Sequence, residues 1–416
     1  MKQNRNKLLY PLVIFFSTLF IYIFFAGRFR FLFPTTIYNY FSFLAEAFLH
    51  GSLAFISTPP YLHDLTSFGG KIYIYWGPAP VFLILPFVLL YGKEISDAFY
   101  TSIIASFNPL ILYLILSQIQ KLKLIRASSY QKIILCVFFA FGTVHFYLSI
   151  FGTVWFTSQV ISTFYLLIGL FCITRFSESR SLKTLILSAL FFGLAVNSRS
   201  TLIFYLPLFL FFYITSYINS NNSLKKKLYL LIFFIIGAII FSLNTYYNYL
   251  RFGSFFENGY KFQNYAAHFA EDKEKYGFFN IAYIPRNFYY MFIHLPTFIN
   301  KPPFFSFDTE GNGVLFTSPL FLILILLIKR KYWQNTKLKL FNLSILVGIF
   351  LIMLFLLNFW GTGWVQFGYR YLLDSIPLLI VLLAEVINEA PTILSIALLI
   401  FSILVNILGT LWFLNL

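Results

Sequence analysis

Apolar runs of about 20 residues recur along almost the whole chain, and this repetition limits what the chain can fold into. Such a run is long enough to cross a bilayer as a helix, and a helix satisfies all of its backbone polar groups internally. Only 11% of the 416 residues are charged, whereas a water-soluble domain has about 25%. We therefore expect an all-α polytopic membrane protein that forms one domain over residues 1–416.

The apolar runs predict about 11 transmembrane helices. Their expected ranges are 8–26, 98–119, 131–149, 154–174, 184–198, 200–218, 228–247, 313–329, 339–358, 371–388 and 392–414. One more apolar run, 78–92, is interpreted as an outer-face helix that lies on or dips into the membrane. Counting it as a span would put the basic segment "KLKLIR" (121–126) outside, against the positive-inside rule.

The charges support this topology. The short inner loops hold 18 of the 30 basic residues, and only three of the 14 acids lie inside, namely Glu178, Glu385 and Glu389. We therefore predict a multi-pass protein of the cell membrane with a cytoplasmic N-terminus. Orientation in the membrane explains the net charge of +16, so no nucleic-acid partner is expected. The first segment is interpreted as a retained anchor, with cleavage as the alternative.

Two long outer stretches, 27–97 and 248–312, are too long to be mere connectors and are expected to form the working surface. The first holds an amphipathic helix candidate (37–51) and the loop "HDLTSFGGKIYIYWGPAP" (63–80). Asp64 in this loop precedes a Gly-Gly turn and a strand-like run, 71–76. Such a loop suits a carboxylate that acts as a general base at the lipid–water boundary. A solvated aspartate, or one that caps a turn, is the alternative.

Basic residues near the outer helix ends are candidates for binding a phosphate, because an arginine fork matches phosphate oxygens. Arg370 in "FGYRYLLDSIPLL" is ringed by aromatic residues, and an ion pair with Asp374 is its rival explanation. Arg199 lies at a similar helix junction, and Arg251 lies in "YYNYLRFGSFFENGY" (246–260), where a snorkelling arginine in an aromatic belt is the alternative. The candidates for binding donor phosphate or lipid are Arg370, Arg199, Arg251 and Lys71.

Aromatic and amide side chains near these basic residues suit sugar rings and isoprenoid chains. The candidates for binding the sugar or the acceptor are Tyr75, Trp76, Trp155, Gln159, Asn248, Glu257, Trp364 and Tyr369. The chain has no P-loop, no G-x-S-x-G, no H-E-x-x-H and no Cys/His metal spacing. We therefore expect no metal and no cofactor, and an activated donor would come from the membrane.

Together these segments resemble the GT-C superfamily of integral-membrane glycosyltransferases, which includes protein O-mannosyltransferases and the lipid A aminoarabinose transferase. The resemblance rests on the large first outer loop with two membrane-lying helices, the second opened by "GPAPVFLILPF" (77–87). It also rests on "GLAVNSR" (193–199), "YNYLRFGSFFENGY", "DTEGNGVLFTSPLFL" and "FGYRYLLDSIPLL". These motifs are spread over most of the chain.

The resemblance implies a fold, a donor and a reaction. A polyprenyl-phosphate sugar would be the donor, and a lipid, glycan or protein on the extracytoplasmic face would accept the sugar with inversion. A first-loop carboxylate would be the base. Many relatives carry an acid just after the first helix, but "GRFRFLFPTTIYNY" (27–40) has none. Asp64 is therefore the nominated base, with Glu46 in reserve.

Three other functions stay open from the sequence. A transporter or flippase of lipid-linked sugars often has two similar halves, and none are recognisable here. A glycan polymerase or ligase would use diphosphate-linked donors. A purely structural membrane protein would not need two long polar outer stretches.

Overall fold

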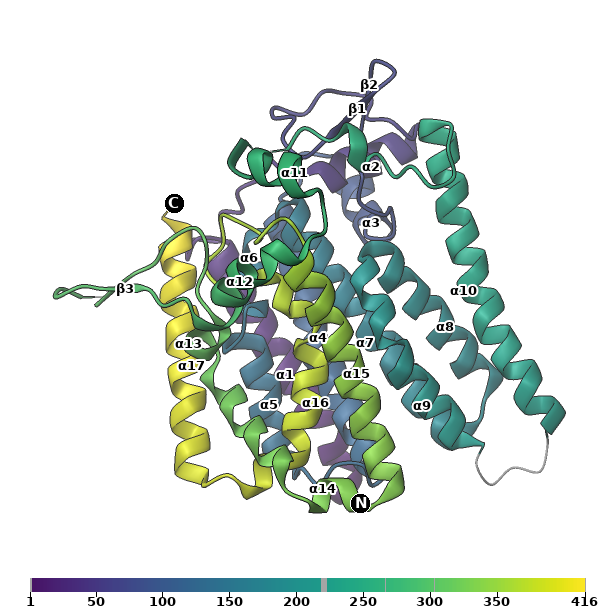
Figure 1. Ribbon diagram of the computed structural model, residues 1–416, viewed down its shortest axis with the longest axis vertical. Coiled ribbons are helices and arrows are strands. Elements are labelled where there is room, and N and C mark those ends of the chain that lie inside the picture. Colours follow the sequence, from purple (N-terminus) through teal and green to yellow (C-terminus); the bar gives the residue numbers. More distant parts are fainter. Residues whose placement is uncertain (1, 218–222, 266, 303, 416) are drawn as a thin grey trace.

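The computed structural model describes residues 2–217, 223–265, 267–302 and 304–415. Helices run mostly side by side and form a bundle, with the two long loops folded over one end (Figure 1). The bundle elements are α1 (Lys2–Ala26), α4 (Asp97–Lys121), α5 (Ser129–Phe141), α6 (His145–Phe151), α7 (Thr153–Ser179), α8 (Leu182–Ser198), the 3₁₀ helix η1 (Ser200–Tyr205), α9 (Leu206–Ser216), α10 (Ser223–Phe252), α13 (Val314–Thr317), the 3₁₀ helix η6 (Pro319–Ile328), α15 (Thr336–Asn358), the 3₁₀ helix η7 (Arg370–Asp374), α16 (Ile376–Val386) and α17 (Thr392–Leu414).

All 11 predicted ranges fall on these helices, although residue 218, the last of one range, lies outside the described residues. Among the described residues, six helices are long and apolar enough to cross a membrane, and a seventh span forms if α5 and α6 are joined across their 50° bend. The chain is thus a multi-pass membrane protein. The other four ranges fall on shorter elements: α8 has 17 residues, and the remaining three ranges are divided between short α-helical and 3₁₀ segments. The count of 11 spans stays a prediction.

The first outer loop contains α2 (Tyr40–Leu49), the hairpin β1 (Thr66–Phe68) and β2 (Lys71–Tyr73), and α3 (Val81–Tyr91). Gly69 and Gly70 form the turn of the hairpin, and both have positive φ. The strands pair in antiparallel register, with Thr66 opposite Tyr73. Helix α3 has 11 residues, or about 16 Å of helix. It is too short to cross a bilayer core of about 30 Å, which agrees with its interpretation as a helix that does not span.

The second outer loop is built from short elements. They are η2 (Tyr260–Phe262), η3 (Ala267–Phe269), α11 (Ala270–Tyr276), η4 (Ile281–Tyr283), α12 (Ile284–Phe288), a π-helical turn η5 (Tyr289–Ile293) and the hairpin β3 (Thr297–Phe298) and β4 (Phe305–Ser306). Helix α14 (Lys331–Gln334) and the 3₁₀ helix η8 (Ile387–Glu389) lie at the opposite end of the bundle. That end also holds the N-terminus, whereas the C-terminus lies at the end with the two loops (Figure 1).

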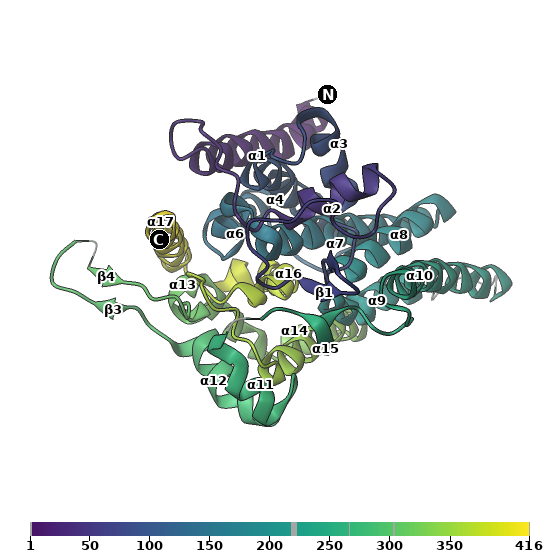
Figure 2. The ribbon, with the colours of Figure 1, turned by 90° about the horizontal axis from the view of Figure 1, so that it is seen from above.

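Several buried polar side chains in the bundle have hydrogen-bond partners within it. His145, at the bend between α5 and α6, lies within hydrogen-bond distance of Tyr22, Asn108 and Ser149. This network links α1, α4 and α6. Helix α10 is the exception to the close packing. Only 6% of its apolar window is buried, and it leans away from the bundle with α8 as its neighbour (Figures 1 and 2).

Candidate functional site

Asp64 lies where the two outer loops meet. Its backbone has a φ of +60°, and its amide donates to the carbonyl of Asn264 in the second loop at 2.6 Å. Thr66 forms a β-bridge with Gln263 of the same segment. The pairing of the hairpin with residues 263–264 therefore fixes the position of Asp64.

The Asp64 carboxylate is held by two side-chain donors from different parts of the fold. Trp155 Nε1 on α7 donates to Oδ2 at 2.8 Å, and Gln263 Nε2 donates to Oδ1 at 2.7 Å. His63 Nε2 lies 3.9 Å from Oδ2. The side chain is 16% exposed, so the carboxylate is fixed in orientation but is not sealed from the surface.

Arg370 also lies near the Trp155 indole. Its guanidinium carbon is 5.7 Å from the Trp155 ring centre and 5.1 Å from that of Tyr371. Gln366 and Gln159 hold its backbone, with Arg370 N donating to Gln366 Oε1 and Gln159 Nε2 donating to Arg370 O. The side chain is buried, and Nε has no hydrogen-bond partner among the described residues. The structure thus holds a buried cation that no carboxylate neutralises in the described part of the chain.

The rival explanation for Arg370, an ion pair with Asp374, is wrong. Asp374 instead binds Arg199, whose Nε donates to both carboxylate oxygens at 2.5 and 2.6 Å, and it accepts from Thr201. The reason is local. Residues 370–374 form a 3₁₀ helix, in which residues i and i+3 eclipse, so residue i+4 turns to another face. Arg199 is therefore neutralised and Arg370 is not.

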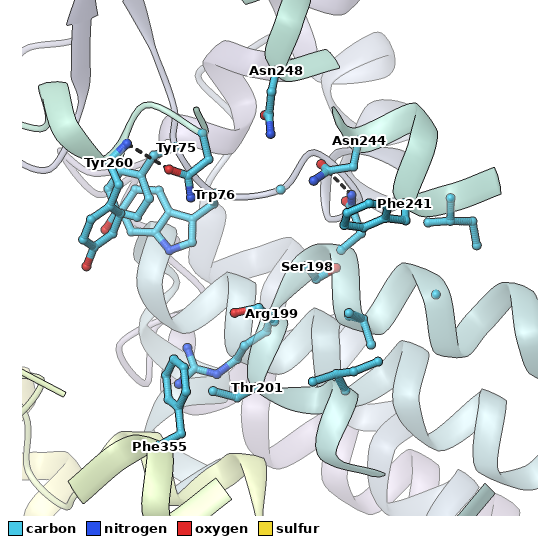
Figure 3. A pocket seen from close by; sticks show the side chains of 18 of the residues that line it. Tyr75, Trp76, Ser198, Arg199, Thr201, Phe241, Asn244, Asn248, Tyr260 and Phe355 are labelled. Atoms are coloured by element: carbon cyan, nitrogen blue, oxygen red, sulfur yellow. Dashed lines mark hydrogen bonds between the residues drawn. The ribbon is translucent and has the colours of Figure 1, made fainter. Parts of the chain in front are cut away.

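A cavity of about 1210 Å³ lies beside Trp155 and Tyr371 (Figure 3). Trp155, Gln159 and Tyr371 line it next to Arg370, and Arg199 and Thr201 line it deeper in the bundle. Residues of α8, α10 and α15 form its membrane-level walls, which are rich in phenylalanine. The walls at the loop end come from residues 75–77, 256–258 and 260–261. The cavity therefore has a polar, aromatic end and an apolar end.

Tyr75 and Trp76 lie at the polar end, where Figure 3 shows them beside Tyr260. The Tyr75 and Trp76 rings stack with centroids 3.8 Å apart, and Tyr260 meets Tyr75 edge-on at 4.8 Å. Burial raises the pKa of Tyr75 well above its ordinary value, and the nearby negative charge of Asp64 raises it further. Tyr75 therefore stays a neutral phenol and brings a hydroxyl and an apolar face to the cavity.

Arg251 joins the cavity wall to the first loop. Its Nη1 donates to the carbonyl of Ile74 at 2.5 Å, and its Nη2 donates to Asn248 Oδ1 at 2.8 Å. It lies over the Tyr247 ring at 3.9 Å, and its Nε is buried without a partner among the described residues. Asn248 and Glu257 line the cavity as well, and Glu257 accepts from the Gly259 amide.

The first outer loop and the end of α8 make a close backbone contact at Gly77 and Asn197. A Cβ on Gly77 would lie 1.7 Å from the carbonyl oxygen of Asn197, so only glycine fits there. The Asn197 side chain accepts from the Ala79 amide and donates to Asn244 on α10. These contacts fix the position of residues 75–77 at the cavity.

Six of the predicted site residues do not line the cavity. Two of them, Asp64 and Arg370, lie against Trp155, which does line it, and the other four lie elsewhere. Glu46 pairs with Lys93 at 3.1 Å on the outer side of α2. Lys71 is exposed on the hairpin, Trp364 stacks on His268 at 4.3 Å, and Tyr369 is buried below Arg370. The structure thus brings Asp64, Arg370, Arg199, Arg251, Tyr75, Trp76, Trp155, Gln159, Asn248 and Glu257 to one region.

Sequence reasoning missed several residues of this region. Gln263, which holds the Asp64 carboxylate, stands in "KFQNYA" with no motif to mark it. Asn197 was quoted within "GLAVNSR" but received no role. Lys273 on α11 lies over the rings of Tyr265, Phe278 and Trp360, at 3.3, 4.6 and 5.4 Å. No i+3 or i+4 spacing in the sequence could predict this group of aromatic rings around Lys273, because the rings come from separate segments.

Fold and site together define a polytopic membrane protein with a cavity beneath two long loops, and its structure is similar over most of the chain to that of GT-C enzymes. The archaeal oligosaccharyltransferase AglB from Archaeoglobus fulgidus, in complex with an inhibitory peptide and a dolichol-phosphate, has a similar structure. The TM-score is 0.50 at 14% identity, over 95% of this chain and 56% of AglB. ArnT from Cupriavidus metallidurans bound to undecaprenyl phosphate gives a TM-score of 0.48 at 12% identity, over 91% of this chain and 60% of ArnT.

The chain thus spans a little over half the length of these solved structures. No protein-family model matches the sequence, and no curated protein matches it either. At this identity the similarity to AglB defines the fold and nothing finer.

Proposed function

We propose that this protein is an inverting glycosyltransferase that moves a sugar from a polyprenyl-phosphate donor to an acceptor at the end of the bundle that carries the outer loops. We place that end on the extracytoplasmic side, as the charge distribution predicts. The observation that carries the proposal is the arrangement around Trp155. A fixed carboxylate, Asp64, and a buried uncompensated cation, Arg370, both lie against the indole of Trp155, which lines the cavity.

The cavity suits both parts of such a donor. Its phenylalanine-rich walls on α8, α10 and α15 lie at membrane depth, where each buried CH₂ of an isoprenoid chain contributes about 0.8 kcal/mol. Helix α10, which forms one of these walls, is only 6% buried over its apolar window, so an isoprenoid chain would enter beside it. The bound dolichol-phosphate of AglB indicates the same class of lipid. The stacked Tyr75 and Trp76 offer an aromatic face to a sugar ring.

The proposed reaction is one displacement step. The acceptor hydroxyl oxygen attacks the anomeric carbon, its proton passes to the Asp64 carboxylate, and the bond from the anomeric carbon to the phosphate oxygen breaks. The lipid phosphate leaves with the electron pair of that bond. Arg370 stabilises the charge that develops on it, which a preorganised cation in a site of low polarity does well. Arg251 and Gln263 position the hairpin and the base.

A transfer assay with three variants tests this. The full chain, purified in nanodiscs, is given radiolabelled sugars on polyprenyl monophosphate or diphosphate, with membrane extract as acceptor. We expect transfer from the monophosphate donor, a loss of about 10²–10⁴-fold for Asp64→Asn and of about 10²–10³-fold for Arg370→Gln. Glu94→Gln, an exposed acid of the same loop, is the matched control and should retain activity.

Two outcomes would contradict the proposal. Full activity of Asp64→Asn removes the base, and transfer from the diphosphate donor alone indicates a polymerase or ligase.

A further inference from the structure

A second hollow lies at the end of α1, where the chain enters the first outer loop. It has a volume of about 710 Å³ and is lined by Arg28, Phe29, Arg30, Leu32, Phe33 and Pro34. None of these residues lines the large cavity. Helix α1 lies at the edge of the molecule, on the side away from α11 and α12 (Figure 2). The hollow is therefore separate from the site described above.

The two arginines of this hollow have no acidic partner among the described residues. Arg28 Nη1 donates to the carbonyl of Leu414 at the end of α17, at 3.0 Å, and its guanidinium lies 5.6 Å from the Phe151 ring centre. Arg30 is exposed and makes no side-chain hydrogen bond within the described chain. Two neighbouring guanidinium groups at the end of a membrane-spanning helix are a site for an anion.

The backbone presents apolar side chains beside these cations. Arg28, Phe29 and Phe31 have φ values of 54°, 62° and 56°, which a non-glycine residue seldom adopts. The resulting tight turn leaves Phe29, Phe31 and Leu32 exposed by 42%, 52% and 65%. Exposed aromatic groups next to arginines are typical of the boundary between headgroups and acyl chains.

A stripe of phenylalanines leads from the membrane to this turn. Phe16 and Phe20 on α1 are exposed by 61% and 64%. Phe20 stacks on Phe24 at 6.1 Å, and Phe24 contacts Phe29 and Phe31 at 5.2 and 5.9 Å. The stripe ends at the arginine pair. An apolar surface that ends at two cations is complementary in shape and in charge to one anionic lipid.

We infer that the 28–34 turn and the outward face of α1 form a binding site for one phosphate-bearing membrane lipid. The phosphate would lie between Arg28 and Arg30, and the acyl chains would lie along Phe16, Phe20 and Phe24. Because Arg28 also binds the end of α17, the lipid would tie the start of the first outer loop to the C-terminal helix. This inference does not depend on the proposed glycosyltransferase activity.

Native mass spectrometry of the full chain tests the site with three probes: phosphatidylglycerol, phosphatidylcholine and glycerol 3-phosphate. We expect one saturable phosphatidylglycerol that Arg30→Gln weakens about fivefold, since a basic residue near the membrane surface contributes about a factor of five. Arg28→Gln combined with Arg30→Gln should weaken it further. Lys275→Gln, an exposed outer lysine on α11, is the charge-matched control and should change nothing.

Three results would overturn the inference: equal binding of phosphatidylcholine, an equal loss with Lys275→Gln, or glycerol 3-phosphate binding as tightly as the lipid. Replacing Arg28 also removes its hydrogen bond to the end of α17. The single Arg30→Gln variant therefore decides, because the Arg30 side chain has no partner in the described fold. A thermal unfolding curve for each variant confirms that it is folded. A photoactivatable phosphatidylglycerol should label residues 29–32 in the unaltered chain and label them more weakly in Arg30→Gln.

Discussion

Replacing Trp155 by phenylalanine separates the two roles of the indole. The change removes the Nε1–H that donates to Asp64 Oδ2 at 2.8 Å but keeps an aromatic ring beside Arg370. A hydrogen bond to a charged group contributes about 1.5–3 kcal/mol. The Asp64 side chain is only 16% exposed, so water replaces little of this interaction. If the bond serves to orient the base, kcat/KM should fall by roughly 10- to 150-fold, at about 1.4 kcal/mol per tenfold.

The assay is initial-rate transfer from the polyprenyl-monophosphate donor over a range of donor concentrations. Trp333→Phe is the control, because it also removes one indole hydrogen bond, to the carbonyl of Leu327, at the far end of the bundle. The loss in Trp155→Phe should appear mainly in kcat, since Arg370 and the lipid walls stay in place. A variant with unchanged kcat would refute the orienting role of Trp155. So would a fall equal to that of Trp333→Phe.

Three further predictions concern the frame of the site and the opposite end of the bundle. Asp374→Asn leaves Arg199, whose side chain is 17% exposed, without its carboxylate and should lower the unfolding free energy by about 3 kcal/mol, the lower end for a broken buried pair, measured by thermal or denaturant unfolding in detergent. Gly77→Ala forces a Cβ onto the Asn197 carbonyl and should both destabilise the protein by more than about 1–3 kcal/mol and reduce transfer; unchanged stability would contradict the contact. Burial alone would raise the pKa of Glu389, but hydrogen bonds from neighbouring lysines and a tyrosine lower it to about 2. A small part of the unfolding free energy should therefore be lost as the pH falls from about 4.5 to 2. This pH-dependent loss should be absent in Glu389→Gln.

The helical bundle could be predicted from the sequence because one property decides it. A run of about 20 apolar residues has few alternatives to a helix in a bilayer, so all 11 expected ranges proved helical. Their division into full spans was harder to predict. The break at residue 199 falls between two predicted ranges, but the apolar pattern does not show that residues 319–328 and 370–374 form 3₁₀ helices.

The composition of the site could be predicted only in part. Outer-loop acids and helix-end arginines were visible as residue types, and most of the candidates do gather around the cavity. Which cation is neutralised was not visible, because helical spacing paired Asp374 with Arg370, whereas the 3₁₀ geometry turned Asp374 to Arg199. Gln263 reaches Asp64 through the pairing of two loops, and no local pattern encodes such a contact.

The central claim is that Arg370 receives the phosphate of a polyprenyl lipid beside Asp64. A structure of the full chain with a bound polyprenyl phosphate measures this most directly, through the distance from the phosphorus atom to the Arg370 guanidinium. The account predicts hydrogen-bond contact between the two, with the isoprenoid chain between α10 and α15. A phosphate bound at another basic residue, with the Arg370 guanidinium left unliganded, would contradict it.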